Sequence, residues 1–180
     1  MKKLFTLLVA LLVSVHAYAL TPAQQEVVRL EILNDPVLSA LPPSSDAINA
    51  IILAFQTPAS PVCTVWKTRV TQDEIEQNGF DWVQVDNLTV GKARIWEWMF
   101  NNADRTINPS RLNVRQGVDE AWKGTAAMLA VRAAVYVHLK RPANRLEKLF
   151  ATGACTDASP STMSVEGEMN YEEVRQFMGW

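Results

Sequence analysis

Glu97 lies between two tryptophans, Trp96 and Trp98, a setting in which a carboxyl group can do acid–base chemistry. Aromatic surroundings can raise the pKa of a glutamate until it acts as a general acid, as in glycoside hydrolysis. In a helix, however, residues 96 and 98 point about 100° to either side of residue 97. Arg94 is one turn away, so a surface ion pair between Arg94 and Glu97 is the preferred interpretation.

Other groups suited to catalysis or metal binding are few. His138 is the only histidine after residue 19, which argues against histidine-based metal sites and against a Ser–His–Asp triad. Its apolar surroundings predict a hydrogen-bonded core or boundary residue. A Cys–His pair with Cys63 or Cys155 stays open. Phosphate-binding loops and nucleophile-elbow motifs do not occur. We expect no metal and no cofactor, and we favour a non-enzymatic function.

Two cysteines, Cys63 and Cys155, are the only ones in the chain. In an exported protein such a pair predicts a disulfide. It would close a loop of about 90 residues, and chain-entropy arguments give such a closure roughly 4–5 kcal/mol. Two separate buried thiols are the alternative.

The first 19 residues have the three parts of a secretory signal peptide. Lysines at positions 2 and 3 precede an apolar run over residues 4–15, and Ala-Tyr-Ala at 17–19 predicts cleavage before Leu20. The run is too short to span a membrane comfortably. Cleavage predicts a periplasmic or secreted protein without stable membrane insertion. A retained anchor is the alternative.

Charge argues against nucleic acid as a partner. The whole chain has 17 basic and 19 acidic residues, a net charge of −2. The leader contains two lysines and no acids, so the mature chain has 15 basic residues against 19 acidic ones and a net charge of −4. Phosphate binding needs a basic surface.

Helix-start signals divide residues 20–180 into short helices. The capping residues are Thr21, Thr71, Thr89 and Asn170. Residues 126–140 are apolar on nearly all sides, which predicts a buried helix. Short strands are expected at 62–66 and 163–169. We therefore predict a single, mainly α domain over 20–180. It is expected to be a compact bundle of six to eight short helices around a buried central helix at about 126–140, with one small two-stranded β element added.

Six tryptophans are many for a chain of 180 residues. Tryptophan anchors protein interfaces and lines carbohydrate sites, although packing in the core is its commonest use. The interface candidates are Trp82, Trp96, Trp98 and Trp180. We expect at least one tryptophan to be partly exposed, and Trp180, at the terminus, is the obvious one.

Four segments carry a resemblance to a known family. They are GFDW at 79–82, VDNLTVGKARIWEWM at 85–99, INPS at 107–110 and RAAVYVH at 132–138. They resemble a family of uncharacterised proteins from tailed bacteriophages and prophages, with the likeness extending from about residue 21 to residue 180. The resemblance implies a virion-structural or assembly role and protein partners, either phage structural proteins or further copies of the chain. It implies no activity and no site residues. Proteins of that family usually start near the position of Thr21 and have no leader, so the resemblance also offers a start of translation near Leu20, which would place the protein in the host cytoplasm or a virion.

Three functional hypotheses follow. The first is a non-enzymatic interaction protein of phage or prophage origin. The second is an exported cell-envelope hydrolase acting on peptidoglycan, with Glu97 as the general acid. The third is a periplasmic binding or inhibitor module held together by the Cys63–Cys155 bond.

Overall fold

The computed structural model describes residues 20–180, so the predicted signal peptide at 1–19 lies outside the described residues. Nine helices and six short strands occur within this range. In chain order they are α1 (Pro22–Asn34), α2 (Ser45–Gln56), β1 (Thr64–Trp66), β2 (Val70–Thr71), α3 (Gln72–Ile75), α4 (Val83–Asp86), α5 (Val90–Met99), β3 (Thr106–Ile107), α6 (Leu112–Ala121), α7 (Ala126–His138), β4 (Lys140–Pro142), α8 (Arg145–Leu149), β5 (Ala151–Thr152), β6 (Thr162–Met163) and α9 (Tyr171–Met178). The predicted mainly α fold with a small β content is confirmed, and these residues form nine helices where six to eight were predicted.

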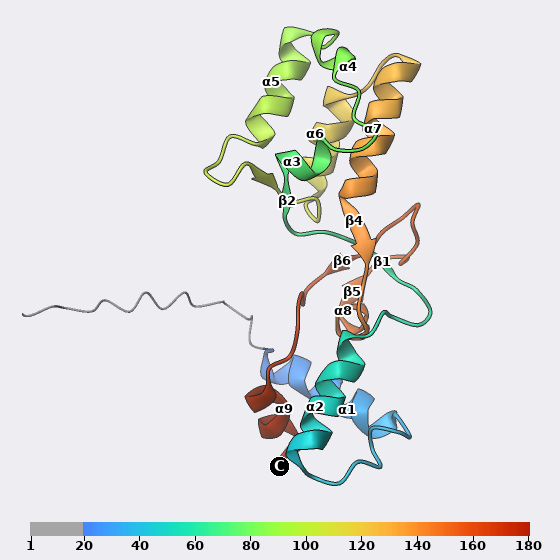
Figure 1. Cartoon of the computed structure of the whole chain (residues 1–180), viewed down its shortest axis with the longest axis vertical. Helices are drawn as coiled ribbons and strands as arrows, with labels where there is room; N and C mark the ends of the chain where they lie inside the picture. Colours follow the sequence, from blue (N-terminus) through green and yellow to red (C-terminus); the bar gives the residue numbers. More distant parts are fainter. Residues whose placement is uncertain (1–19) are drawn as a thin grey trace, which may run out of the picture.

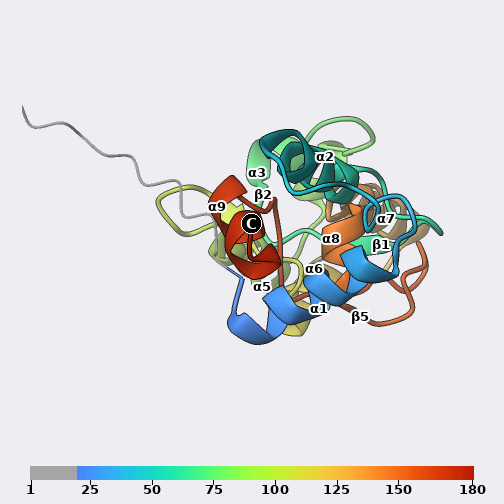
Figure 2. The same ribbon diagram turned by 90° about the horizontal axis from the view of Figure 1, so that it is seen from below.

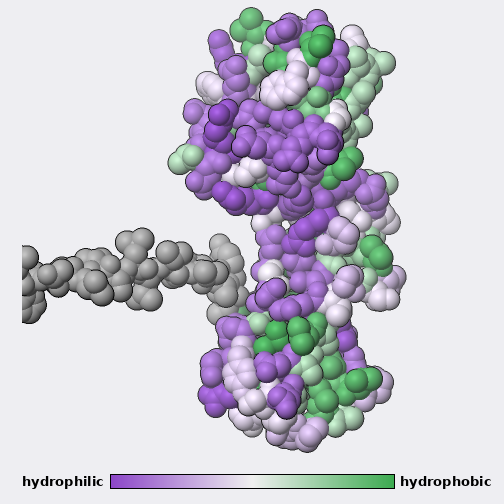
Figure 3. Space-filling view, in the orientation of Figure 1, coloured by the Kyte–Doolittle hydropathy of each residue, from purple (hydrophilic) through white to green (hydrophobic). Residues whose placement is uncertain are grey.

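The elements are arranged as two helical lobes joined by a narrower waist (Figure 1). The upper lobe contains α3 to α7 with β2 and β3, and the lower lobe contains α1, α2, α8 and α9. Strands β1, β4, β5 and β6 form the waist. Hydrophilic residues cover much of this waist, whereas hydrophobic residues reach the surface on the lower lobe (Figure 3).

The lower lobe brings the first and last helices of the described chain together. Thr21 begins α1 with the predicted capping box, and α1 then buries Val28 and Ile32. Helix α9 contacts both α1 and α2, as the view from below shows (Figure 2). Val174 of α9 and Phe55 of α2 share one buried apolar cluster, so residues from both ends of the chain build a single core.

The upper lobe is built around aromatic side chains. Trp96 of α5 lies against Phe80 and Trp122, and also against Phe100, the residue that follows the helix. Helix α7 closes this core with Val131 and Val135.

The prediction of a central helix buried on nearly all sides was wrong in this detail. Met128, Val131 and Val135 of α7 are buried, but Leu129 and Val137 are exposed. Much of the helix's apolar character comes from alanine, whose small side chain costs little to expose. Helix α7 therefore packs one face into the upper lobe.

The strands pair in three short antiparallel ladders: β1 with β4, β2 with β3, and β5 with β6. Three two-stranded elements therefore occur in residues 20–180 where the sequence predicted one. The strand expected over 163–169 covers only Thr162 and Met163. Val65 of β1 forms an isolated parallel bridge with Ser161, which joins two of the ladders within the waist.

Within residues 20–180, no helix combines the length and the apolar character needed to cross a membrane.

Candidate functional site

A hollow of about 500 Å³ lies beside the C-terminal half of α5, and we call it the α5 groove. Its lining combines aromatic, amide and charged side chains: Gln72, Trp96, Glu97, Trp98, Phe100, Asn101, Asn102 and Arg105. The groove lies in the upper lobe.

Helix α5 carries several residues of the groove, and its buried face fixes the helix in the upper lobe. Thr89 caps the helix by accepting a hydrogen bond from the backbone of Lys92. Trp96 and Phe100 anchor the other end of the helix in the aromatic core. Trp98 lies on a different face of the same helix and is 73% exposed. A large aromatic side chain is thus presented to solvent by a helix that is well fixed.

The loop that follows α5 is also well fixed. Asn102 accepts a hydrogen bond from the backbone N–H of Thr106 at 3.0 Å and donates one to the carbonyl of Thr106 at 2.7 Å. Arg105 adopts a φ of +48°, a conformation that is uncommon for residues other than glycine. The carbonyl of Arg105 accepts a hydrogen bond from the backbone N–H of Gln72 at 2.9 Å, which ties the loop to α3.

Gln72 lines the groove and has one unpaired polar atom. Its Nε2 donates to Glu76 at 2.6 Å, but its Oε1 has no partner among the described residues. Most buried polar atoms in proteins are paired, and this one is an exception that lies beneath the surface.

Glu97 lines the groove but lacks the partner that was predicted for it. Among the ion pairs of residues 20–180, none joins Arg94 to Glu97, so that prediction was wrong. Glu97 is exposed. It is also the only carboxylate in the lining, whereas glycoside hydrolysis ordinarily uses two.

The four candidate tryptophans differ in exposure. Trp82 and Trp98 are exposed, in agreement with a surface role. Trp180 is partly buried against the lower-lobe core. Trp96 is only 5% exposed, which corrects its place among the interface candidates. It faces the core because the buried face of α5 runs through residues 96 and 100.

The remaining predicted groups have structural partners. Cys63 and Cys155 are joined by a disulfide, with Cα atoms 4.4 Å apart, so neither supplies a thiolate for a Cys–His pair. Nε2 of His138 lies 3.4 Å from the carbonyl oxygen of Asn78. Residues 20–180 contain no group of histidine, cysteine and acidic side chains able to hold a metal ion.

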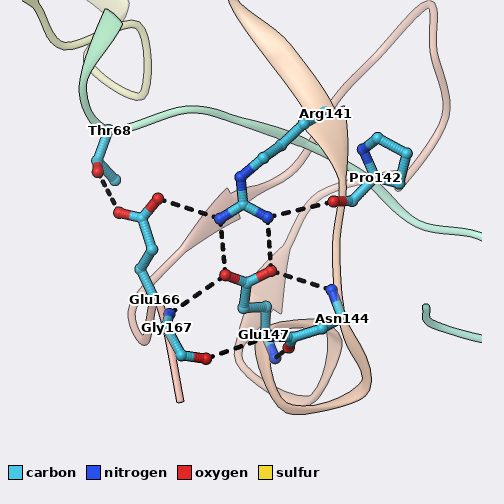
Figure 4. A network of polar contacts seen from close by, with 7 residues as sticks. All are labelled: Thr68, Arg141, Pro142, Asn144, Glu147, Glu166 and Gly167. Atoms are coloured by element: carbon cyan, nitrogen blue, oxygen red, sulfur yellow. Dashed lines mark hydrogen bonds and ion pairs between the residues drawn. The ribbon is translucent and has the colours of Figure 1, made fainter. Parts of the chain in front are cut away.

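A buried ion pair in the waist was missed from the sequence (Figure 4). Glu147 is only 2% exposed and receives both terminal nitrogens of Arg141 at 2.7 Å. Its carboxylate also accepts backbone N–H groups from Asn144 at 3.0 Å and Gly167 at 3.2 Å. Arg141 in turn contacts Glu166 at 3.1 Å. The signal that was available is the Asn144-x-x-Glu147 capping box of α8.

Opposing effects set the pKa of Glu147. Burial acts to raise the pKa of the carboxyl, but the Arg141 guanidinium and the backbone amides outweigh burial and hold the pKa below its usual value. Glu147 raises the pKa of Arg141 in return. Every oxygen of the carboxylate is occupied, so this network stabilises the waist and offers no free group for chemistry.

Comparisons with protein-family models, with curated proteins and with solved structures found no match. The resemblance to the tailed-phage family therefore stays a prediction.

Proposed function

We propose that this chain is a non-enzymatic interaction protein that binds a protein partner through Trp98 and the α5 groove. The observation that carries this proposal is a tryptophan 73% exposed on a fixed helix beside a hollow of about 500 Å³. Tryptophan and arginine are the residues most enriched at the centres of protein interfaces. The groove supplies both, together with amide groups for hydrogen bonds.

The amount of surface at Trp98 is sufficient to matter for binding. A tryptophan buries up to about 200 Å² in a core or an interface. Covering the exposed part of Trp98 at about 25 cal/mol per Å² gives roughly 3–4 kcal/mol before the costs of association. One such residue can dominate an interface of ordinary size.

The class of partner is proposed from the sequence. The resemblance to tailed-phage proteins supports a role as a structural or assembly component of a phage or prophage, with virion proteins or further copies of the chain as partners. The leader-like residues 1–19 add export to the periplasm or beyond.

A sedimentation experiment tests the proposal. Particles and assembly intermediates from an induced culture are separated on a density gradient, and the chain is quantified in each fraction by mass spectrometry. We expect the chain to sediment with particles or as an oligomer. We expect W98A to reduce the bound fraction at least tenfold. Leu53, an exposed apolar residue on α2 in the other lobe, supplies the matched control L53A.

Three results would contradict the proposal. The first is a chain that is monomeric and missing from every particle fraction. The second is a W98A variant that binds as well as L53A. The third is clearing of peptidoglycan in a zymogram that is lost in E97Q, which would support the hydrolase instead.

A further inference from the structure

Glu173 is the second buried glutamate of the described chain. It is 8% exposed and occupies the third position of α9, where it completes a capping box with Asn170. One carboxylate oxygen accepts the backbone N–H of Asn170 at 3.1 Å. The other accepts the backbone N–H of Leu20 at 2.8 Å, across 153 positions of sequence.

The two buried glutamates differ in their positive partners. Glu147 is paired with the guanidinium of Arg141. Among residues 20–180, no ion pair joins Glu173 to a lysine, arginine or histidine. Its carboxylate accepts hydrogen bonds from two neutral amides, one at Asn170 before α9 and one at Leu20 before α1. A buried charge is costly unless an opposite charge accompanies it. Glu173 is therefore a buried carboxylate whose charge is balanced only by backbone amides and by the positive end of the α9 dipole.

Leu20 is held firmly at this position. Its side chain is 5% exposed and belongs to the lower-lobe core. Its carbonyl accepts a hydrogen bond from the Nε2 of Gln25 at 3.1 Å. The nitrogen of Leu20 is thus kept against Glu173 by contacts on either side of it.

We propose that Glu173 binds the α-ammonium group that is created at Leu20 when residues 1–19 are removed. This inference rests on the export part of the proposed function. A signal peptidase hydrolyses the bond between Ala19 and Leu20: water supplies the hydroxyl to the carbonyl carbon of Ala19 and a proton to the nitrogen of Leu20. That nitrogen takes up one more proton near neutral pH and carries a positive charge.

The consequence is that leader removal strengthens the lower lobe. In a chain that retains its leader, the nitrogen of Leu20 is a neutral amide and donates one hydrogen bond to Glu173. In the cleaved chain the same atom belongs to an ammonium group, so the hydrogen bond to the carboxylate becomes an ion pair with opposite charges on its two sides. The pair joins the start of α1 to the start of α9, so it closes the core that the two ends of the chain share.

The experiment begins with the intact mass of the exported, oxidised protein, which is expected to start at Leu20. Four chains are then compared by urea unfolding near pH 7. Two start at Leu20 and two are extended at the N-terminus by the native residues 17–19. One chain of each pair keeps Glu173 and the other carries E173Q. We expect the extension to raise the unfolding equilibrium constant at least tenfold with Glu173, and less than twofold with E173Q. E172Q, at an exposed neighbouring acid, should behave like the Glu173 chain.

An equal effect of the extension in the Glu173 and E173Q chains would overturn the proposal, as would a native chain that starts elsewhere. A second measurement needs no variant. Acylation of the α-amine near pH 7 should be at least tenfold slower in the folded chain than in a Leu-Thr-Pro peptide, because Glu173 holds the ammonium form. Equal rates would also overturn the proposal. None of these results depends on Trp98, so failure here and failure of the α5 groove are distinguishable.

Discussion

Replacing Arg141 by methionine separates charge pairing from packing in the waist. Methionine keeps an unbranched apolar stem of similar length and removes the guanidinium. Glu147 would then keep only its backbone amides from Asn144 and Gly167, at 3.0 Å and 3.2 Å. Removing one partner of a buried ion pair costs about 3–5 kcal/mol, because the remaining charge is left without compensation. We expect R141M to lose stability in this range near pH 7.

The dependence on pH carries the sharper test. The pKa of Glu147 is lowered in the folded wild type, so this group adds stability above its unfolded pKa of about 4.3, and that contribution is lost as pH falls through the folded pKa. In R141M burial acts without the guanidinium, and the pKa of Glu147 is expected to rise above its usual value. The carboxyl then takes up a proton in the native state. The difference between R141M and wild type should therefore be largest near pH 7 and should shrink as pH approaches 4.

The assay is urea unfolding followed by circular dichroism near pH 7 and near pH 4.5, with the disulfide oxidised. R175M is the control, because Arg175 pairs with Glu172 on the surface and such pairs contribute about 0–1 kcal/mol. A loss of 3–5 kcal/mol in R141M that does not change with pH would refute the charge argument and assign the effect to packing.

Two further predictions concern stability. Reduction of the disulfide, which spans 92 residues, should lower the free energy of unfolding by about 4–5 kcal/mol, measured by urea unfolding with and without reductant. Among the glycines, G91A should stabilise the chain by about 1 kcal/mol, because the added Cβ meets nothing within 4 Å on a helix. G153A should destabilise it by more than 1 kcal/mol, since φ is +137° and the Cβ would lie 3.1 Å from the backbone of Ser161. Thermal unfolding of both variants checks the opposite signs.

Local signals were enough to place many of the helices. Thr21, Thr71, Thr89 and Asn170 cap helices where the sequence predicted them. A capping side chain accepts a hydrogen bond from the backbone two or three residues away, so a short stretch of sequence is enough to predict it. The mainly helical class followed from such stretches.

Features that depend on distant partners were not predictable in the same way. Trp96 is buried and Trp98 is exposed because Phe80 and Trp122 lie against only one face of α5. The sequence around residues 96–98 cannot predict which distant residues will pack there. The strands are two or three residues long, which is too short for an alternation of apolar and polar residues to be recognised. The α5 groove joins Gln72 to Arg105, and only the folded loop brings these residues together.

The path of the chain through the waist has a consequence for biosynthesis. The chain enters the upper lobe after β1 and leaves it into β4, and Trp66 lies opposite Lys140 in that ladder. The upper lobe is therefore one uninterrupted stretch, complete once β4 has been made. The lower lobe must wait for α9, the last helix of the chain. A growing chain can finish its upper lobe while α1 and α2 still lack α9, which contacts both of them, so the lower lobe closes only after Tyr171–Met178 has been made.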